Sequence, residues 1–250
     1  MTLTITEILW GIDAILALVC GVRIYQGYKR TNDKMVGDYA KFFIFFGTGF
    51  VVATIADPII EDLFFVKLLI TISLAAIFLG MAYLAKLAVA LIYPRLEWKV
   101  FWLAILANIA TVFANVKYYL LSPYQSPFLD PKTGIFVVNF PVVVSFLLTL
   151  AIVGLMIVPG IIFIRKALRS EDKTVKTRGM LLGLGIILFA VGAMACGAGK
   201  TVLPMQISHL FIAGGYLPFL VGLFYVVEKK IPEAIPTVEV FSAAAPKIKW

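Results

Sequence analysis

The chain has 250 residues, of which 62% are hydrophobic and only 14% are charged. Soluble domains carry about 25% charged residues and about 45–50% apolar ones. This composition therefore excludes an ordinary soluble domain and indicates an integral membrane protein. The formal net charge of +8 fits basic loops at a membrane surface, and nucleic acid is not an expected partner.

Seven stretches of the sequence are apolar enough to cross a lipid bilayer, which takes roughly 20 residues of helix. In chain order they are Ile8–Ile24, Lys41–Ile60, Phe64–Tyr93, Trp98–Leu121, Phe136–Ile164, Gly179–Gly199 and Ser208–Val227. We therefore predict an all-α integral membrane protein with seven transmembrane helices over residues 1–227. Residues 228–250 are broken by prolines, and we expect them to form a short, disordered cytoplasmic tail.

The basic residues are divided unevenly between the two sets of loops. Most of the 22 lysines and arginines lie in the first, third and fifth connections and in the C-terminal tail. Because such loops stay in the cytoplasm, we expect a multi-pass protein of the cell membrane with its N-terminus outside. The most basic connection, Arg165–Arg178, should contact anionic lipids, and an acidic protein partner is the alternative. Lys86, near the inner end of the third span, should extend to the lipid headgroups.

The outer connection between the fourth and fifth spans, Ser122–Asn139, has a pattern of its own. Turn-forming residues at Asp130–Gly134 separate two short apolar runs, which is typical of a small β-hairpin. The hairpin would lie over the outer mouth of the helix bundle. It would act either as a lid over a pocket or as a plain connector.

Small residues recur at four-residue spacing along the sixth span. Gly179 and Gly183 form a GxxxG pair, and the spacing continues to Gly199. Such positions let helices touch backbone to backbone, within one chain rather than in a homodimer. The expected partners are glycines of the second and last spans: Gly47, Gly49, Gly214, Gly215 and Gly222.

Ionisable side chains inside a bilayer are costly, so each one marks a candidate site. Four of them fall in the outer third of the predicted bundle, and one amide lies toward the same side: Asp13, Asp57, Lys200, His209 and Asn115. We expect a polar pocket between the first, second, sixth and seventh spans that takes a small ligand or an ion. In it, Asp13 would pair with Lys200 or with His209. The alternative is a structural ion pair that anchors the helices.

The sequence lacks the residues required for a phosphate-binding loop or a bis-histidine haem site, and those for a zinc site would have to come from several spans. The segment Gly197–Thr201 ends like a phosphate-binding loop, but Met194 stands where the first glycine belongs. His209 is the only histidine, which excludes a bis-histidine haem, and a zinc site would need Cys196 with carboxylates from other spans. We therefore expect no metal and no cofactor, and an enzyme is disfavoured.

The layout resembles the seven-transmembrane sensor modules at the N-terminus of some prokaryotic histidine kinases. The likeness lies in the number of spans, the orientation, the polar outer mouth and the basic junction Ala167–Leu182. It implies a sensor-like or small-ligand-binding protein, although no output domain follows the last span within this sequence. The alternative is a small transporter or a structural membrane subunit of a larger complex.

Overall fold

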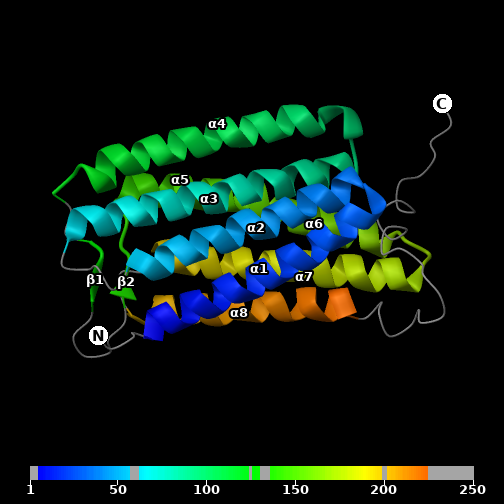
Figure 1. The fold of residues 1–250 in the computed structure, drawn as a ribbon. Coiled ribbons are helices and arrows are strands. Elements are labelled where there is room, and N and C mark those ends of the chain that lie inside the picture. Colours follow the sequence, from blue (N-terminus) through cyan, green and yellow to red (C-terminus); the bar gives the residue numbers. More distant parts are fainter. Residues whose placement is uncertain (1–4, 57–61, 124–125, 130–135, 199–201, 225–250) are drawn as a thin grey trace.

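The computed structural model describes residues 5–56, 62–123, 126–129, 136–198 and 202–224 as a bundle of long helices (Figure 1). The helices are α1 (Ile5–Thr31), α2 (Lys34–Ala56), α3 (Leu63–Ala90), α4 (Glu97–Asn115), α5 (Val142–Ile152), α6 (Val158–Leu168), α7 (Lys173–Ala198) and α8 (Val202–Phe224). A short 3₁₀ turn, η2 (Pro94–Leu96), precedes α4, and two π-helical segments, η3 (Val116–Leu120) and η4 (Val153–Ile157), follow α4 and α5.

Consecutive helices pack side by side through most of the bundle. In Figure 1, α4, α3, α2 and α1 follow one another across the molecule, and α7 lies between α6 and α8. The bundle closes where α8 contacts α1. The helix α1 and the last helix are therefore neighbours, although they are far apart in the sequence.

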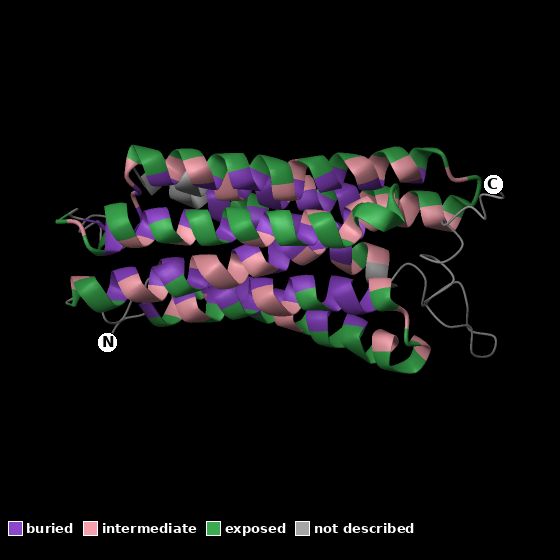
Figure 2. Ribbon diagram, turned by 90° about the horizontal axis from the view of Figure 1, so that it is seen from above, coloured by how far each residue is buried: buried purple, intermediate pink, exposed green. Residues whose placement is uncertain are grey.

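The described helices have the length and the surface of membrane spans. Six of them are long and apolar enough to cross a bilayer: Ile8–Thr31, Lys34–Ala56, Leu63–Ala90, Pro94–Leu120, Val142–Leu168 and Lys173–Ala195. In α8 the corresponding apolar stretch is shorter, Ile207–Gly222. Buried residues face the inside of the bundle (Figure 2), while large apolar side chains such as Leu103 and Phe113 are exposed on its outside. A surface of this kind belongs in lipid rather than in water, so the chain is a multi-pass membrane protein.

The helices extend beyond the apolar runs of the sequence. The first connection consists of only Asn32 and Asp33, because α1 continues to Thr31 and α2 begins at Lys34. Asn32 turns the chain with a φ of 53°, a left-handed conformation that asparagine tolerates. The Asp33 carboxylate then accepts a hydrogen bond from the Met35 backbone N–H at 2.8 Å. The prediction that the second span begins at Lys41 is therefore wrong by about two turns, and Ser208 is likewise not the start of α8.

Two short strands lie between α4 and α5. Strands β1 (Phe128–Leu129) and β2 (Phe136–Val137) pair antiparallel, with Phe128 opposite Val137. The Ser126 hydroxyl also accepts a hydrogen bond from the Asn139 backbone N–H at 2.8 Å. The turn residues 130–135 lie outside the described part of the chain. Figure 1 places both strands at the end of the bundle where α1 begins, and we call it the strand end.

The helices accommodate the prolines Pro159 and Pro218 in different ways. The π-helical segment η4 comes directly before α6, and Pro159 lies in the first turn of α6. A proline has no N–H for the carbonyl four residues earlier, and a π turn is a known way for a helix to absorb such an interruption. In α8, by contrast, Pro218 lies inside a helix that continues from Val202 to Phe224.

The small residues of α7 bring two different helices close to it. A Cβ atom added at Gly183 would lie 2.6 Å from the Gly160 carbonyl oxygen of α6, and one added at Gly192 would lie 2.8 Å from the Ser208 carbonyl oxygen of α8. The expected contact with the last helix is present at Gly215, where an added Cβ would lie 3.0 Å from the Gly185 carbonyl oxygen.

The predicted glycine contacts between α7 and α2 are wrong. An added Cβ at Gly47 would meet Leu18 of α1, and one at Gly49 would meet Ser73 and Ile77 of α3. Gly214 has nothing within 4 Å of its Cβ position. The glycines of α2 therefore pack against α1 and α3, and those of α7 pack against α6 and α8.

Candidate functional site

Helices α1 and α8 bring together two of the predicted site residues, Asp13 and His209. Both side chains are buried, with exposed fractions of 1% and 3%. The Asp13 Oδ2 atom lies 3.6 Å from the His209 Nδ1 atom. The Trp10 ring, one turn before Asp13, lies beside the imidazole with 6.0 Å between ring centroids. Since α8 begins at Val202, His209 is about two turns inside the helix and not at its start.

The polar atoms of this cluster are unsatisfied. At 3.6 Å the pair is too long for a hydrogen bond. Among the described residues, neither carboxylate oxygen of Asp13 and neither ring nitrogen of His209 has a hydrogen-bond partner. The hydroxyl groups of Ser208 and Tyr216, which are fully buried, have none either. Buried polar groups are nearly always hydrogen-bonded. These atoms are therefore available to bind a further hydrogen-bonding group.

The sequence of α8 explains why Tyr216 belongs to the cluster. Tyr216 follows His209 by seven residues, which is two helical turns, so both lie on one face. Side chains of a helix lean toward its N-terminus, which directs the Tyr216 hydroxyl toward the level of His209. The Tyr216 ring is held from the other side by Phe189 of α7, with 4.6 Å between centroids. We call Asp13, His209 and Tyr216 the Asp13 cluster.

The other predicted site residues do not join the Asp13 cluster. Asp57 and Lys200 lie outside the described residues, so their place in the pocket and the pairing of Asp13 with Lys200 stay predictions. Asn115 is buried at the end of α4, where its Oδ1 atom lies 2.7 Å from the Thr71 hydroxyl of α3. The main neighbours of α4 are α3 and α5, whereas those of α1 are α2 and α8. Asn115 therefore belongs to a different part of the strand end.

A buried lysine accompanies Asn115. The Lys67 side chain is 3% exposed. Its Nζ atom donates a hydrogen bond to the Ser122 carbonyl at 3.1 Å and lies 5.4 Å from the centre of the Tyr119 ring. A cation at the end of a helix stabilises the carbonyl groups there, so this lysine secures the α4–η3 end against α3.

The contact between Thr71 and Asn115 can be tested with a matched pair of variants. Thr71→Val should lower the free energy of unfolding by about 1–3 kcal/mol, because it leaves a buried amide without its partner. Thr111→Val removes a hydroxyl that is equally buried but bonds only to the Ala107 carbonyl of its own helix, and it should have little effect. Equal losses in reversible denaturant titrations of the two variants would contradict this assignment.

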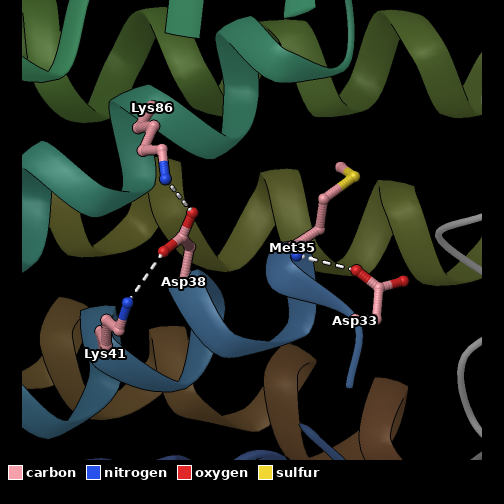
Figure 3. Close-up of polar contacts among 5 residues, drawn as sticks. All are labelled: Asp33, Met35, Asp38, Lys41 and Lys86. Atoms are coloured by element: carbon pink, nitrogen blue, oxygen red, sulfur yellow. Dashed lines mark hydrogen bonds and ion pairs between the residues drawn. The ribbon is translucent and has the colours of Figure 1, made fainter. Parts of the chain in front are cut away.

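A third polar cluster lies at the end of the bundle opposite the strands (Figure 3). Its centre is Asp38 of α2, whose carboxylate pairs with Lys86 of α3 at 2.5 Å and with Lys41 at 3.2 Å. The Lys86 Nζ atom also lies 3.9 Å from the centre of the Trp98 ring of α4. Lys86 is 5% exposed, so the expectation that it extends to the lipid headgroups is wrong. It ties α2, α3 and α4 together.

A groove of about 420 Å³ lies on the seam between α3 and α4. Its lining residues are apolar except for one amide: Ala75, Asn108, Ile109, Val112, Phe113 and Val116. The Asn108 Nδ2 atom donates to the Ala75 carbonyl at 3.3 Å. Since Ile109 and Phe113 are among the most exposed apolar side chains, the groove opens toward lipid. It does not include the Asp13 cluster.

The described residues contain no group of three or more histidine, cysteine, aspartate or glutamate side chains that could hold a metal ion. Comparisons of the chain with protein-family models, with curated proteins and with solved structures find no match. A functional hypothesis therefore has to rest on the chemistry of the clusters themselves.

Proposed function

We propose that the chain is a sensor-like, seven-helix membrane protein that binds a small ligand in the Asp13 cluster. The strand end faces the outside, and the C-terminus lies in the cytoplasm. The observation that carries the proposal is the set of buried polar atoms on α1 and α8 that have no partner among the described residues. The apolar stretch of α8 is short, but the whole helix has 23 residues, which is enough for a seventh span.

A ligand explains this cluster better than a structural ion pair does. A buried ion pair stabilises a fold only when its geometry is good and its remaining lone pairs and protons are hydrogen-bonded. The cluster around Asp38 meets this condition, since Asp38 pairs with Lys86 at 2.5 Å and with Lys41 at 3.2 Å. Asp13 and His209 do not meet it. The carboxylate oxygens of Asp13 and the ring nitrogens of His209 are therefore available to form hydrogen bonds with a ligand.

The position of the cluster suggests how binding is sensed. It joins α1 to α8, the last described helix, and α8 contains Pro218, a position at which helices bend readily. A ligand that binds better to one arrangement of α1 and α8 shifts the population toward it. On the cytoplasmic side, the basic connection Arg165–Arg178 offers a contact for anionic lipids or for an acidic partner.

Ligand binding can be tested by the thermal stability of the full-length protein in detergent. Wild-type protein, Asp13→Asn and the control Asn108→Leu, a buried amide of α4 outside the cluster, are heated with a panel of amino acids, amines, sugars and carboxylates. We expect at least one compound to raise the Tm of the wild type and of Asn108→Leu but not that of Asp13→Asn. If every compound acts equally on all three proteins, the Asp13 cluster is not a binding site.

The orientation has a test of its own. In a Cys20→Ala/Cys196→Ala background, single cysteines replace Pro123 at the strand end and Glu171 at the opposite end, both of which are exposed. A membrane-impermeant maleimide added to intact cells should label Pro123→Cys, and it should label Glu171→Cys only after lysis. The reverse pattern would place the strand end in the cytoplasm.

A further inference from the structure

The free atoms of the Asp13 cluster are mostly hydrogen-bond acceptors. The carboxylate of Asp13 offers two oxygen atoms, and a neutral imidazole offers one acceptor nitrogen. None of these has a partner among the described residues. The hydroxyl group of Tyr216 is able to donate or accept. Within the described part of the chain, no positively charged donor fills these acceptors.

Other occupants fit these atoms less well. An anion would be repelled by the Asp13 carboxylate. A divalent metal ion usually takes more ligating groups than one carboxylate and one imidazole, and the described residues supply no third acidic, histidine or cysteine ligand. A proton on His209 alone gives an ion pair whose 3.6 Å separation is too long for a hydrogen bond, so the Asp13 oxygen atoms stay without a donor.

We propose that the ligand of the Asp13 cluster is the ammonium ion or a small primary alkylammonium ion. This inference rests on the proposed function, since it names the chemical class of the ligand at the same site. An ammonium group carries three or more N–H donors and one positive charge, which matches one carboxylate and one neutral imidazole. The Asp13 Oδ2 and His209 Nδ1 atoms are 3.6 Å apart, so a nitrogen about 2.9 Å from each of them reaches both.

The aromatic side chains around the cluster favour the same class of ligand. The Trp10 ring lies beside His209, and Tyr216 is fully buried on the same face of α8. Faces of tryptophan and tyrosine rings attract cations, most strongly where water is excluded. Because Asp13, His209 and Tyr216 are at most 3% exposed, the ligand has to be small, of the size of ammonium or methylammonium.

An ammonium ion would bridge α1 and α8, which otherwise have a small contact with each other. The contact of α1 with α8 is less extensive than that of α1 with α2 or of α7 with α8. A ligand held by Asp13 from one side and by His209 from the other adds a bridge across this interface. A ligand that binds the folded state raises its stability by mass action, which gives the experiment its readout.

The test measures the Tm of the full-length protein in detergent at one pH and one ionic strength. Ammonium chloride, methylammonium chloride, tetramethylammonium chloride and sodium chloride are titrated separately. We expect the first two to give a saturable rise in Tm. Tetramethylammonium has the charge but no N–H donor, so it should give none. His209→Gln should weaken the response about tenfold, the effect expected for the loss of one hydrogen bond to a charged group, and Asp13→Asn should abolish it.

The outcomes separate this inference from the proposed function. An equal response to tetramethylammonium or to sodium would overturn it, as would an unchanged response in Asp13→Asn. If Asp13→Asn does not fold, Asp13→Glu keeps the charge and should bind more weakly than the wild type, while Asn108→Leu should bind as the wild type does. If the ammonium salts have no effect but another compound requires Asp13, the ammonium class is wrong and the binding site stands. If no compound requires Asp13, both are wrong.

Discussion

Asp38→Asn should lower the free energy of unfolding by about 3–5 kcal/mol, the cost of leaving a buried charge without its partner. The Lys86 side chain is 6% exposed, and its remaining neighbour is the Trp98 ring, 3.9 Å from Nζ. A cation–π contact contributes only about 0.5–2 kcal/mol, so it does not replace the carboxylate. Reversible unfolding in a denaturing detergent or in guanidinium gives the free energy.

A second variant tests whether the loss of stability comes from the burial of the ion pair or from the loss of any ion pair. Lys41 pairs with the same carboxylate, but its side chain is 49% exposed, and exposed ion pairs contribute about 0–1 kcal/mol. Lys41→Met should therefore have a small effect. The double variant Asp38→Leu/Lys86→Met should recover most of the loss, because well-packed apolar pairs often replace buried ion pairs at little cost. Equal losses in Asp38→Asn and Lys41→Met would show that burial does not control this cluster.

Asp38 also illustrates why hydropathy alone misplaces helix ends. The second apolar run begins at Lys41, which leaves Asp38 outside the predicted span. Yet α2 begins two turns earlier, at Lys34, because Asn32 makes a tight turn and Asp33 caps the first backbone N–H groups. Aspartate and asparagine before a helix are start signals that the sequence contains. They would have placed Asp38 inside the helix, although not next to Lys86, which is 48 residues away.

The ionisable residues of the candidate site could be predicted from the sequence, because such residues are rare within apolar runs. Asp13 and His209 stand out in apolar runs, and the structure places them 3.6 Å apart. The neighbours of a polar residue were harder to predict, because they depend on which helices pack together. Asn115 was expected in the same pocket, but it lies on α4 and contacts Thr71 of α3. Tyr216 was missed because tyrosine does not mark a site by charge, although its seven-residue spacing from His209 puts it on the same face.

Gly183→Leu should prevent α6 and α7 from packing, and among the glycines of α7 with described surroundings we expect its substitution to have the largest effect. A Cβ atom at this position would lie 2.5 Å from the Ile164 side chain and 2.6 Å from the Gly160 carbonyl oxygen. The carbonyl belongs to the backbone of α6, so it cannot move unless the two helices separate. Even Gly183→Ala should cost about 1–3 kcal/mol, the usual range for overpacking.

Gly214 provides the matched control, since it is a glycine within α8 with nothing within 4 Å of its Cβ position. Gly214→Ala should be neutral or stabilise the protein by up to about 1 kcal/mol, because glycine is a poor helix former. The same experiment distinguishes packing within the chain from dimerisation. If the glycine face of α7 were a homodimer contact, Gly183→Ala would change the oligomeric state measured by size exclusion with light scattering. Because α6 already fills that face, we expect the loss to appear in the free energy of unfolding while the oligomeric state stays the same.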